Sequence, residues 1–419
     1  MSRRRSAIRR RARRARRVII ATGVASVATP ISLAIALTGV DALRKRRTPD
    51  EHSVPPDEPL GADVDGNDLT TYTYGEHLFE DMLAAIDAAT DFVYLVTYIW
   101  KGDQIGQRFK DAVIRAAERG VTVCVVFDGF ANLVVPREFK TFPESVHLLK
   151  FPTIRSGLVI NVRRTGRDHR KVLVVDGKVG FVGGYNIGDM YARTWRDTHI
   201  RVRGVAVWEL QNTFVDFWNR HGKRHHPTLE DSGSPVWNSR ILAARNEPSR
   251  LVFPVRGIYL EAIDRATQRI WITQGYFIPD REIMGGLLAA ARRGVDIRVL
   301  MPEASNHVVA DWVARSQYTK LLEGGVRIFL YQDVMVHAKT ATVDGTWTTV
   351  GTANIDRLSL IGNYEVNLEI HDVGQADQME RIFRRDLENA RELTLREWES
   401  RGRASKLAEW ILEPLHPLL

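Results

Sequence analysis

The sequence predicts an α/β protein made of two tandem copies of one unit. Each copy is expected to form a mixed sheet flanked by helices, and the copies to pack about a pseudo-twofold axis after one transmembrane helix. HRKVLVVDG, residues 169–177, has its His, Lys and Asp at the same offsets as HAKTATVDG, residues 337–345. AVIRAAERGVTVCVVFD, residues 112–128, aligns with GLLAAARRGVDIRVLMP, residues 286–302. An internal duplication of this length dictates the architecture, because each copy folds as the same supersecondary unit.

The N-terminal segment, residues 1–47, differs sharply in charge from the rest of the chain. It holds fourteen Lys and Arg and one acidic residue, so the remainder carries a net charge of −5 although the whole chain carries +8. Residues 1–17 form a basic segment, and residues 18–40, which follow it, carry no charge. A helix of that length crosses the hydrocarbon core of a bilayer, so we predict a single-pass membrane anchor. The alternative is a cleaved signal peptide, because Ala34–Ala36 resembles a cleavage site.

The charges around this span bear on location and partners. The excess of Arg before the span favours a cytoplasmic N-terminus in a cell membrane, and the positive flank after it leaves open which side carries the body. Residues 41–68, rich in Pro, Asp and Gly, are predicted to be a flexible linker. An acidic body lacks the electrostatic footprint of a nucleic-acid-binding protein, so we expect no nucleic acid partner.

The repeat sets the remaining boundaries. We place the first copy at residues 69–222, a connector at 223–247, the second copy at 248–390 and a helical or interfacial segment at 391–419. The apolar side chains of the last segment either contact a membrane interface or pack on the body.

The same elements are predicted in both copies. A β-branched and aromatic strand, at residues 94–100 and again at 270–279, is followed by an amphipathic helix that stops at Gly120 or Gly294 and then by an alternating strand. KVLVVDGKVGFVGG, which begins at Lys171, predicts two buried strands joined by a turn.

Each copy contributes the same set of reactive side chains. The carboxylate follows the histidine at the same spacing in both copies, and the full set is His169, Lys171, Asn186, Asp197, His337, Lys339, Asn354 and Glu365. In a strand, H-x-K places His and Lys on one face, and packing about a twofold axis would bring the two faces together. Such a site fits phosphoryl transfer from a phosphodiester. Lys and Asn donors would stabilise the phosphate oxygens, while one His would attack phosphorus and the other would protonate the leaving alkoxide.

We expect the acidic residues of each copy to support the histidines and lysines. Asp197 and Glu365 are expected to accept the other ring N–H of the histidines and fix their tautomer. Asp176 and Asp344 complete the two motifs and are counted with His and Lys as the catalytic set, although the Gly after each indicates turn-forming residues that anchor the motif more than reactants. No metal or cofactor is expected, because the lysines neutralise the phosphate charge. A single H-x-K-x-x-x-x-D match is weak evidence, whereas two matches with the same downstream spacing favour a catalytic site over a structural histidine.

The motifs resemble those of a known family. RDHRKVLVVDG, GGYNIGDMY and HAKTATVDGTWTTVGTANIDRLSLIGNYEVNLEI are similar to the phospholipase D superfamily, and within it to the bacterial cardiolipin synthases, over about residues 71–419. The resemblance implies that His169 forms a phosphohistidine and His337 is the general acid and base, although the sequence alone does not choose between them. It also implies phosphate-supporting roles for Gly184 and for Thr352, which stands where the family usually has Ser.

The family implies a reaction between lipids. One phosphatidylglycerol donates its phosphatidyl group to the enzyme and the hydroxyl of a second accepts it, giving cardiolipin and glycerol, which fits a membrane anchor. A phospholipase D-type phosphodiesterase would use the same residues with water and release phosphatidic acid. A nuclease and a tethered non-catalytic protein are less favoured, and no protein partner is indicated. Four aromatic residues after the paired strands either line the entrance to the site or pack in the core: Tyr98, Trp100, Tyr276 and Phe277.

Overall fold

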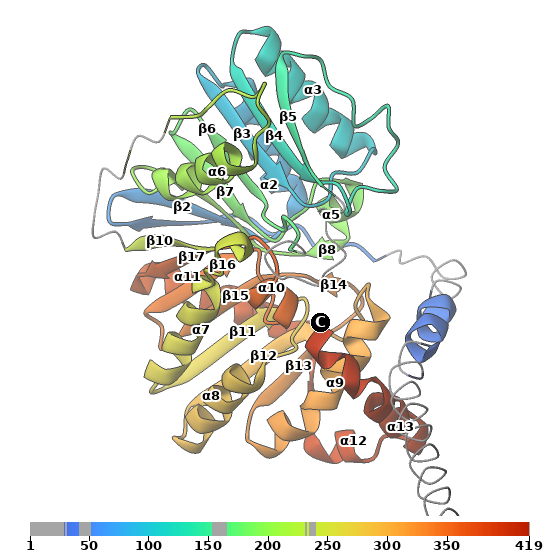
Figure 1. Cartoon of the computed structure of the whole chain (residues 1–419). Coiled ribbons are helices and arrows are strands. Elements are labelled where there is room, and N and C mark those ends of the chain that lie inside the picture. The colour runs from blue at the N-terminus through green and yellow to red at the C-terminus, as the bar shows by residue number, and fades with distance from the viewer. Residues whose placement is uncertain are drawn as a thin grey trace, which may run out of the picture.

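The computed structural model describes residues 29, 32–41, 52–152, 166–230, 233 and 240–418 (Figure 1). Two eight-stranded mixed sheets lie one above the other in Figure 1, the first half of the chain above and the second half below. The expected α/β fold of two tandem units is therefore confirmed.

The first sheet has the strand order β1-β2-β9-β7-β6-β3-β4-β5. Its strands are β1 (Leu60–Val64), β2 (Asn67–Tyr72), β3 (Phe92–Thr97), β4 (Thr122–Asp128), β5 (Val146–Phe151), β6 (Val172–Val175), β7 (Val179–Gly183) and β9 (His199–Arg203). Strands β3, β4 and β5 are parallel, and the other neighbours pair antiparallel.

The second sheet has the order β10-β17-β16-β15-β11-β12-β13-β18. Its strands are β10 (Ile241–Asn246), β11 (Arg269–Gln274), β12 (Asp296–Pro302), β13 (Arg327–Tyr331), β15 (Lys339–Val343), β16 (Trp347–Gly351), β17 (Glu365–His371) and β18 (Ala390–Leu393). The central six strands, from β17 to β13, repeat the order from β9 to β5 in the first sheet. The duplication seen in the sequence is therefore a duplication of topology.

Helices cover both sheets. In the first half they are α2 (Gly75–Asp87), α3 (Gln104–Glu118), α5 (Asp189–Arg193) and α6 (Val207–His221). In the second half they are α7 (Pro254–Arg265), α8 (Arg281–Arg292), α9 (Val308–Glu323), α10 (Arg357–Ile361), α11 (Val373–Glu388), α12 (Leu395–Glu399) and α13 (Arg403–Leu412), with 3₁₀ turns at Pro248–Arg250 and Glu413–Leu418. The predicted helix stops form as expected, since Gly120 and Gly294 follow α3 and α8 with φ of 89° and 91°.

One apolar cluster is shared between the two halves. Helices α2 and α3 pack on one face of the first sheet, and α7, α8 and α9 pack on one face of the second. The opposite faces meet through a cluster that includes Val182, Phe214 of α6, Val350, Val366 and Met379 of α11. Because this cluster draws on both sheets, the halves are held in a fixed arrangement with the site between them.

Three strands extend beyond the predicted boundaries. Residues 60–68, assigned to the linker, form β1 and the start of β2, because Asp65 and Gly66, with φ of 54° and 76°, make a hairpin turn. Strand β10 lies in the predicted connector and pairs with β17. Strand β18 lies at the start of the predicted C-terminal segment and pairs with β13. All three are edge or next-to-edge strands with weak apolar patterns, so the sequence did not reveal them.

The terminal segments are only partly described. Residues 1–17 and most of the predicted span at 18–40 lie outside the described residues. Among the residues that the structure does describe, no helix is both long and apolar enough to cross a membrane. Leu33, Ala34 and Leu37, from the described stretch 32–41, pack against the core of the second half. At the other end of the chain, Leu412 of α13 is buried in the same core while Trp410 is 69% exposed, so α13 both docks on the body and presents an apolar face.

Candidate active site

Reciprocal backbone contacts join the halves at the site. The short strands β8 (Trp195–Arg196) and β14 (Met335–Val336) pair in parallel, and His337 N donates to Arg196 O at 2.7 Å. Asp168 forms an equivalent bridge with Tyr364, where His169 N donates to Tyr364 O at 3.0 Å. In each case the residue before a motif histidine lies beside the residue before the carboxylate of the other half.

This pairing crosses the histidines and carboxylates between the halves. His169 Nδ1 lies 2.9 and 3.0 Å from the two carboxylate oxygens of Glu365, and His337 Nδ1 lies 2.6 Å from Asp197 Oδ2. An ionised carboxylate only accepts, so each Nδ1 carries the proton and each Nε2 has a free lone pair. The sequence left open which carboxylate serves which histidine, and the structure places each acceptor in the opposite half.

The H-x-K segments differ from the predicted strand geometry. Strand β6 begins at Val172 and β15 at Lys339, so both histidines lie just before a strand. The reason is that their backbone N–H groups bond to the other half and not to a neighbouring strand. Each lysine is buried and folds back onto the histidine of its own motif. Lys171 Nζ donates to His169 O at 2.6 Å, and Lys339 Nζ donates to the equivalent carbonyl of His337.

Burial controls the ionisation of the lysines and of Asp197. Burial lowers the pKa of Lys171 to about 7 and that of Lys339 to about 8, although Asp197 and Glu365 oppose both shifts. Burial raises the pKa of Asp197 to about 6. Near neutral pH these three groups can all be charged, but the pH interval in which this holds is narrow.

Both histidines are held in the neutral form. Burial lowers the pKa of His169, and Glu365 only partly offsets this shift. Burial also lowers the pKa of His337 well below its usual value, and the charges of Lys339 and Lys171 lower it further. A neutral imidazole whose Nδ1–H is bound to a carboxylate presents Nε2 as a nucleophile or a base.

Asp176 and Asp344 lie at the far ends of the motif strands from the histidines. Both have φ of 52°. The carboxylate of Asp176 accepts from the backbone N–H groups of residues 90–92 and from Thr90 Oγ1, at 2.9 to 3.0 Å. Asp344 makes the same contacts with residues 267–269, at 2.8 to 2.9 Å. These carboxylates fix the start of β3 and of β11 and do not reach the histidines, which fits the anchoring role expected of them.

The residues predicted to support phosphate make contacts with the protein around the two histidine–carboxylate pairs. Thr352 Oγ1 donates to Glu365 Oε2 at 2.6 Å, so this hydroxyl holds the carboxylate of the His169 pair. A side chain on Gly184 would place Cβ 2.0 Å from Asp197 Oδ1, so this glycine makes room for the other carboxylate. Asn186 and Asn354 are buried, and Asn186 Oδ1 accepts from Ile99 N at 3.1 Å.

Aromatic rings enclose the histidines. Tyr98 packs edge-on against His169, with ring centroids 4.6 Å apart, and Tyr276 packs against His337 at 6.1 Å. Trp195 lies closer to His337, at 4.9 Å. It was not among the predicted site residues, although it stands two residues before Asp197. The other two candidate aromatics, Trp100 and Phe277, are buried in the core and do not line the entrance.

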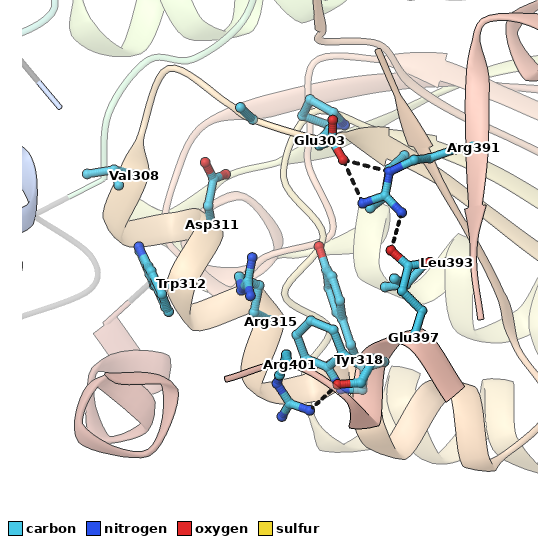
Figure 2. A pocket seen from close by; sticks show the side chains of 14 residues that line it. Glu303, Val308, Asp311, Trp312, Arg315, Tyr318, Arg391, Leu393, Glu397 and Arg401 are labelled. Atoms are coloured by element: carbon cyan, nitrogen blue, oxygen red, sulfur yellow. Dashed lines mark hydrogen bonds and ion pairs between the residues drawn. The ribbon is translucent and has the colours of Figure 1, made fainter. Parts of the chain in front are cut away.

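A separate cavity of about 350 Å³ lies in the second half, between α9, β13 and the C-terminal segment (Figure 2). None of the predicted site residues lines it. Figure 2 shows Arg391 bonded to Glu303 and Glu397. Arg401 pairs with Glu409, which lies outside the lining of the cavity. The arginines of its wall are therefore paired with neighbouring carboxylates, and the cavity is distinct from the histidine site.

Comparison with solved structures supports the fold. The phosphatidylserine synthase of Haemophilus influenzae Rd KW20 matches with a TM-score of 0.63 and 14% identity, over 90% of this chain and 96% of that chain. The polyphosphate kinase of Porphyromonas gingivalis matches with a TM-score of 0.55 and 14% identity, over 89% of this chain and 58% of that chain. At this level of identity the likeness extends to the fold alone.

Sequence comparison identifies the family. Residues 82–218 and 259–387 match the family described as "Cardiolipin synthase, PLD-like domain". Cardiolipin synthase 2 of Staphylococcus epidermidis is 33% identical over 373 residues, which cover 84% of this chain and 75% of that protein. The major cardiolipin synthase of Bacillus subtilis (strain 168) is also 33% identical, over 85% of this chain and 76% of that protein. Together with the two crossed motifs, these matches show that the chain belongs to the cardiolipin synthase family of phospholipase D-like proteins.

Proposed function

We propose that this protein is a phosphatidyltransferase that condenses two phosphatidylglycerols to cardiolipin and glycerol. The observation that carries the proposal is the pair of crossed histidine–carboxylate contacts, each with a buried lysine beside it. Two imidazoles and two cations at one site can supply the nucleophile, the general acid and base, and the charge neutralisation that a two-step transfer of a phosphodiester requires.

In the first step, Nε2 of one histidine attacks phosphorus and a P–N bond forms while the P–O bond to the departing glycerol breaks. The other histidine first takes up a proton from solvent on Nε2 when the anionic phosphodiester binds, because a nearby negative charge raises the pKa of an imidazole. It then gives that proton to the departing glycerol oxygen. By family resemblance, His169 is the nucleophile and His337 the general acid.

In the second step, a hydroxyl of another phosphatidylglycerol attacks the phosphohistidine. His337 takes the hydroxyl proton, an O–P bond forms and the P–N bond breaks, which releases cardiolipin and regenerates both histidines. Lys171 and Lys339 neutralise the phosphate oxygens throughout, since an ammonium group in a buried site stabilises developing negative charge more strongly than it does in water.

The surroundings of the histidines support a lipid acceptor over water. The side chain of His169 is 12% exposed and that of His337 6%, so little of either ring faces bulk solvent. We also propose that residues 18–40 anchor the chain in the bacterial membrane as a single span, because both substrates are confined to the bilayer.

The test is incubation of the purified protein with labelled phosphatidylglycerol, followed by resolution of the lipids. Cardiolipin with free glycerol is the expected product, whereas phosphatidic acid would identify a hydrolase. His169→Ala and His337→Ala are each expected to abolish product while the far-ultraviolet circular dichroism stays that of the parent. His371→Ala is the matched control, because His371 lies at the far end of β17 with a largely exposed side chain. Turnover at the parent rate by either site variant would overturn the proposal.

A further inference from the structure

The connection between β4 and β5 exposes apolar side chains at its tip. Val134 is 84% exposed, Leu133 59% and Phe130 50%. In the second half, the equivalent connection between β12 and β13 contains helix α9. Several large apolar side chains exposed so close together in the chain indicate a surface that contacts another apolar phase.

The base of this loop is fixed by buried hydrogen bonds. Asn132 donates to Tyr98 O and to Asp128 O, both at 2.8 Å, and accepts from Trp100 N at 2.8 Å. Asp128 Oδ1 accepts from the backbone N–H groups of Phe130 and residue 131 at 2.8 and 3.0 Å. These hydrogen bonds fix the backbone on which the tip stands. The apolar side chains of the tip therefore stay exposed and do not fold onto the body.

The same anchors connect the loop to the candidate nucleophile. Asn132 donates to the backbone carbonyl of Tyr98, and the ring of Tyr98 packs against His169. Asp128 Oδ2 accepts from the backbone N–H of Asp168, the residue before His169, at 3.2 Å. The apolar tip thus stands beside the site, where the acyl chains of a lipid would have to leave the bilayer.

A cation adjoins the tip. The guanidinium of Arg167 lies 4.7 Å from the centre of the Phe130 ring and donates to Pro152 O, and Arg167 forms no salt bridge with any of the described carboxylates. Apolar side chains beside a cation that no described carboxylate neutralises are the combination that binds the headgroup and acyl boundary of an anionic bilayer.

We propose that Phe130, Leu133 and Val134 insert into the surface of an anionic bilayer and place the mouth of the active site against the membrane. This inference deepens the proposed function, on which it rests for the identity of the lipid. The occupant of the surface is the bilayer itself, not a second copy of the chain.

The test uses a fluorescent label on the loop of the full-length protein. Cys124 is the chain's single cysteine; it is buried, and burial raises the pKa of its thiol to about 12, so it is not expected to react. Leu133→Cys is labelled with a polarity-sensitive fluorophore and reconstituted into phosphatidylcholine vesicles with or without phosphatidylglycerol. We expect a shift to shorter emission wavelength in the anionic vesicles, quenching by nitroxides on the acyl chains and protection from aqueous iodide.

Val205→Cys is the matched control. Val205 is 51% exposed and follows the Arg203 end of β9. That end pairs with Val179, whereas the opposite end, at His199, pairs with Gly183 near the site, so Val205 lies at the end of β9 away from the site. Its label should be quenched by iodide and not by the acyl-chain nitroxides. Adding Val134→Asp to Leu133→Cys should weaken insertion without unfolding the protein, because both side chains are exposed.

Two results would overturn the inference. Equal iodide quenching at positions 133 and 205 would mean that the loop stays in water. Protection at position 133 without quenching from the acyl chains would mean that protein covers it. None of these readouts involves turnover, so a loop that inserts in a protein that forms no cardiolipin would refute the proposed function and leave this inference standing.

Discussion

At the scale of single residues, the site depends on two carboxylates that never touch the substrate in the proposed mechanism. Glu365 and Asp197 each hold a histidine of the opposite half in one tautomer. Thr352 in turn holds Glu365, and Gly184 leaves the space that Asp197 occupies. Thr352 and Gly184, which the family resemblance assigns to phosphate support, therefore also shape the surroundings of the two carboxylates.

Loss of either carboxylate should slow the reaction without abolishing it. We expect Asp197→Asn and Glu365→Gln each to lower kcat by about 10- to 100-fold, because the ring loses its oriented, charged acceptor while both nucleophile and acid remain. Steady-state kinetics on phosphatidylglycerol vesicles measure this. Restoration of the charge by Asp197→Glu should recover more activity than Asp197→Asn, and an unchanged kcat in the neutral variants would exclude the positioning role.

The charges at the site also predict a narrow pH optimum. Below about 6 Asp197 takes up a proton, and above about 7 to 8 first Lys171 and then Lys339 lose theirs. We therefore expect kcat/KM to fall on both sides of an optimum between these values, since this ratio reports the ionisation of the free enzyme. In Lys171→Arg, whose guanidinium stays charged, the alkaline limb should move toward the pKa of Lys339. A flat profile across the range from mildly acidic to mildly alkaline pH would contradict the assignment.

At the scale of the elements, the motif aspartates tie each strand pair together. Asp176 joins the end of β6 to the start of β3, and Asp344 joins β15 to β11 in the same way. These contacts explain how one short motif places the histidine of the candidate site at one end of a strand and an anchoring aspartate at the other end.

Removal of one of these anchors should lower stability more than it alters chemistry. We expect Asp176→Ala to reduce the free energy of unfolding by about 1–3 kcal/mol, because backbone donors lose their acceptor and alanine is strained at a positive φ. Asp176→Asn, which keeps an acceptor and tolerates this backbone conformation, should lose less. Urea unfolding followed by circular dichroism compares the two, and equal stability of parent and alanine variant would count against the anchoring role.

The sequence predicted the elements that repeat and missed those that do not. Helix α3 and the hairpin of β6 and β7 have clear periodicity and turn residues, and both recur in the second half. Strands β1, β10 and β18 have no counterpart of similar sequence, and their pairing depends on distant partners. The local pattern of apolar and polar residues in a strand does not show which distant strand it pairs with.

The same limit applies to the site. The spacing between histidine and carboxylate is identical in both halves. It therefore identified the four partners but not their crossing, which depends on the backbone bridge between Asp168 and Tyr364 and its counterpart at β8 and β14. Trp195 has no matching aromatic in the second motif at that spacing, so the repeat did not draw attention to it.

At the scale of the whole molecule, a buried ion pair joins the halves next to the site. Arg196 Nε and Nη2 donate to the two oxygens of Asp386 of α11, both at 2.9 Å, and Arg196 Nη1 donates to Asp197 O at 2.6 Å. The packing of the two halves and the position of Asp197 therefore both depend on the side chain of Arg196.

Breaking this pair should destabilise the protein and disturb catalysis together. We expect Arg196→Met to cost about 3–5 kcal/mol of unfolding free energy, because Asp386 is left as an unpaired buried charge. The double variant Arg196→Met/Asp386→Leu should recover part of that stability, and thermal or urea denaturation of the parent, both single variants and the double variant gives the coupling energy. If the double variant is no more stable than Arg196→Met, the uncompensated charge is not the cause.

The exchange of carboxylates between the repeats has a consequence for ancestry. A solitary repeat would carry a histidine without its acceptor, so a one-copy forebear could have worked only as a symmetrical pair of chains. Within a single chain the two acceptors need not be identical, and they are not: the shorter Asp197 serves one histidine and the longer Glu365 serves the other.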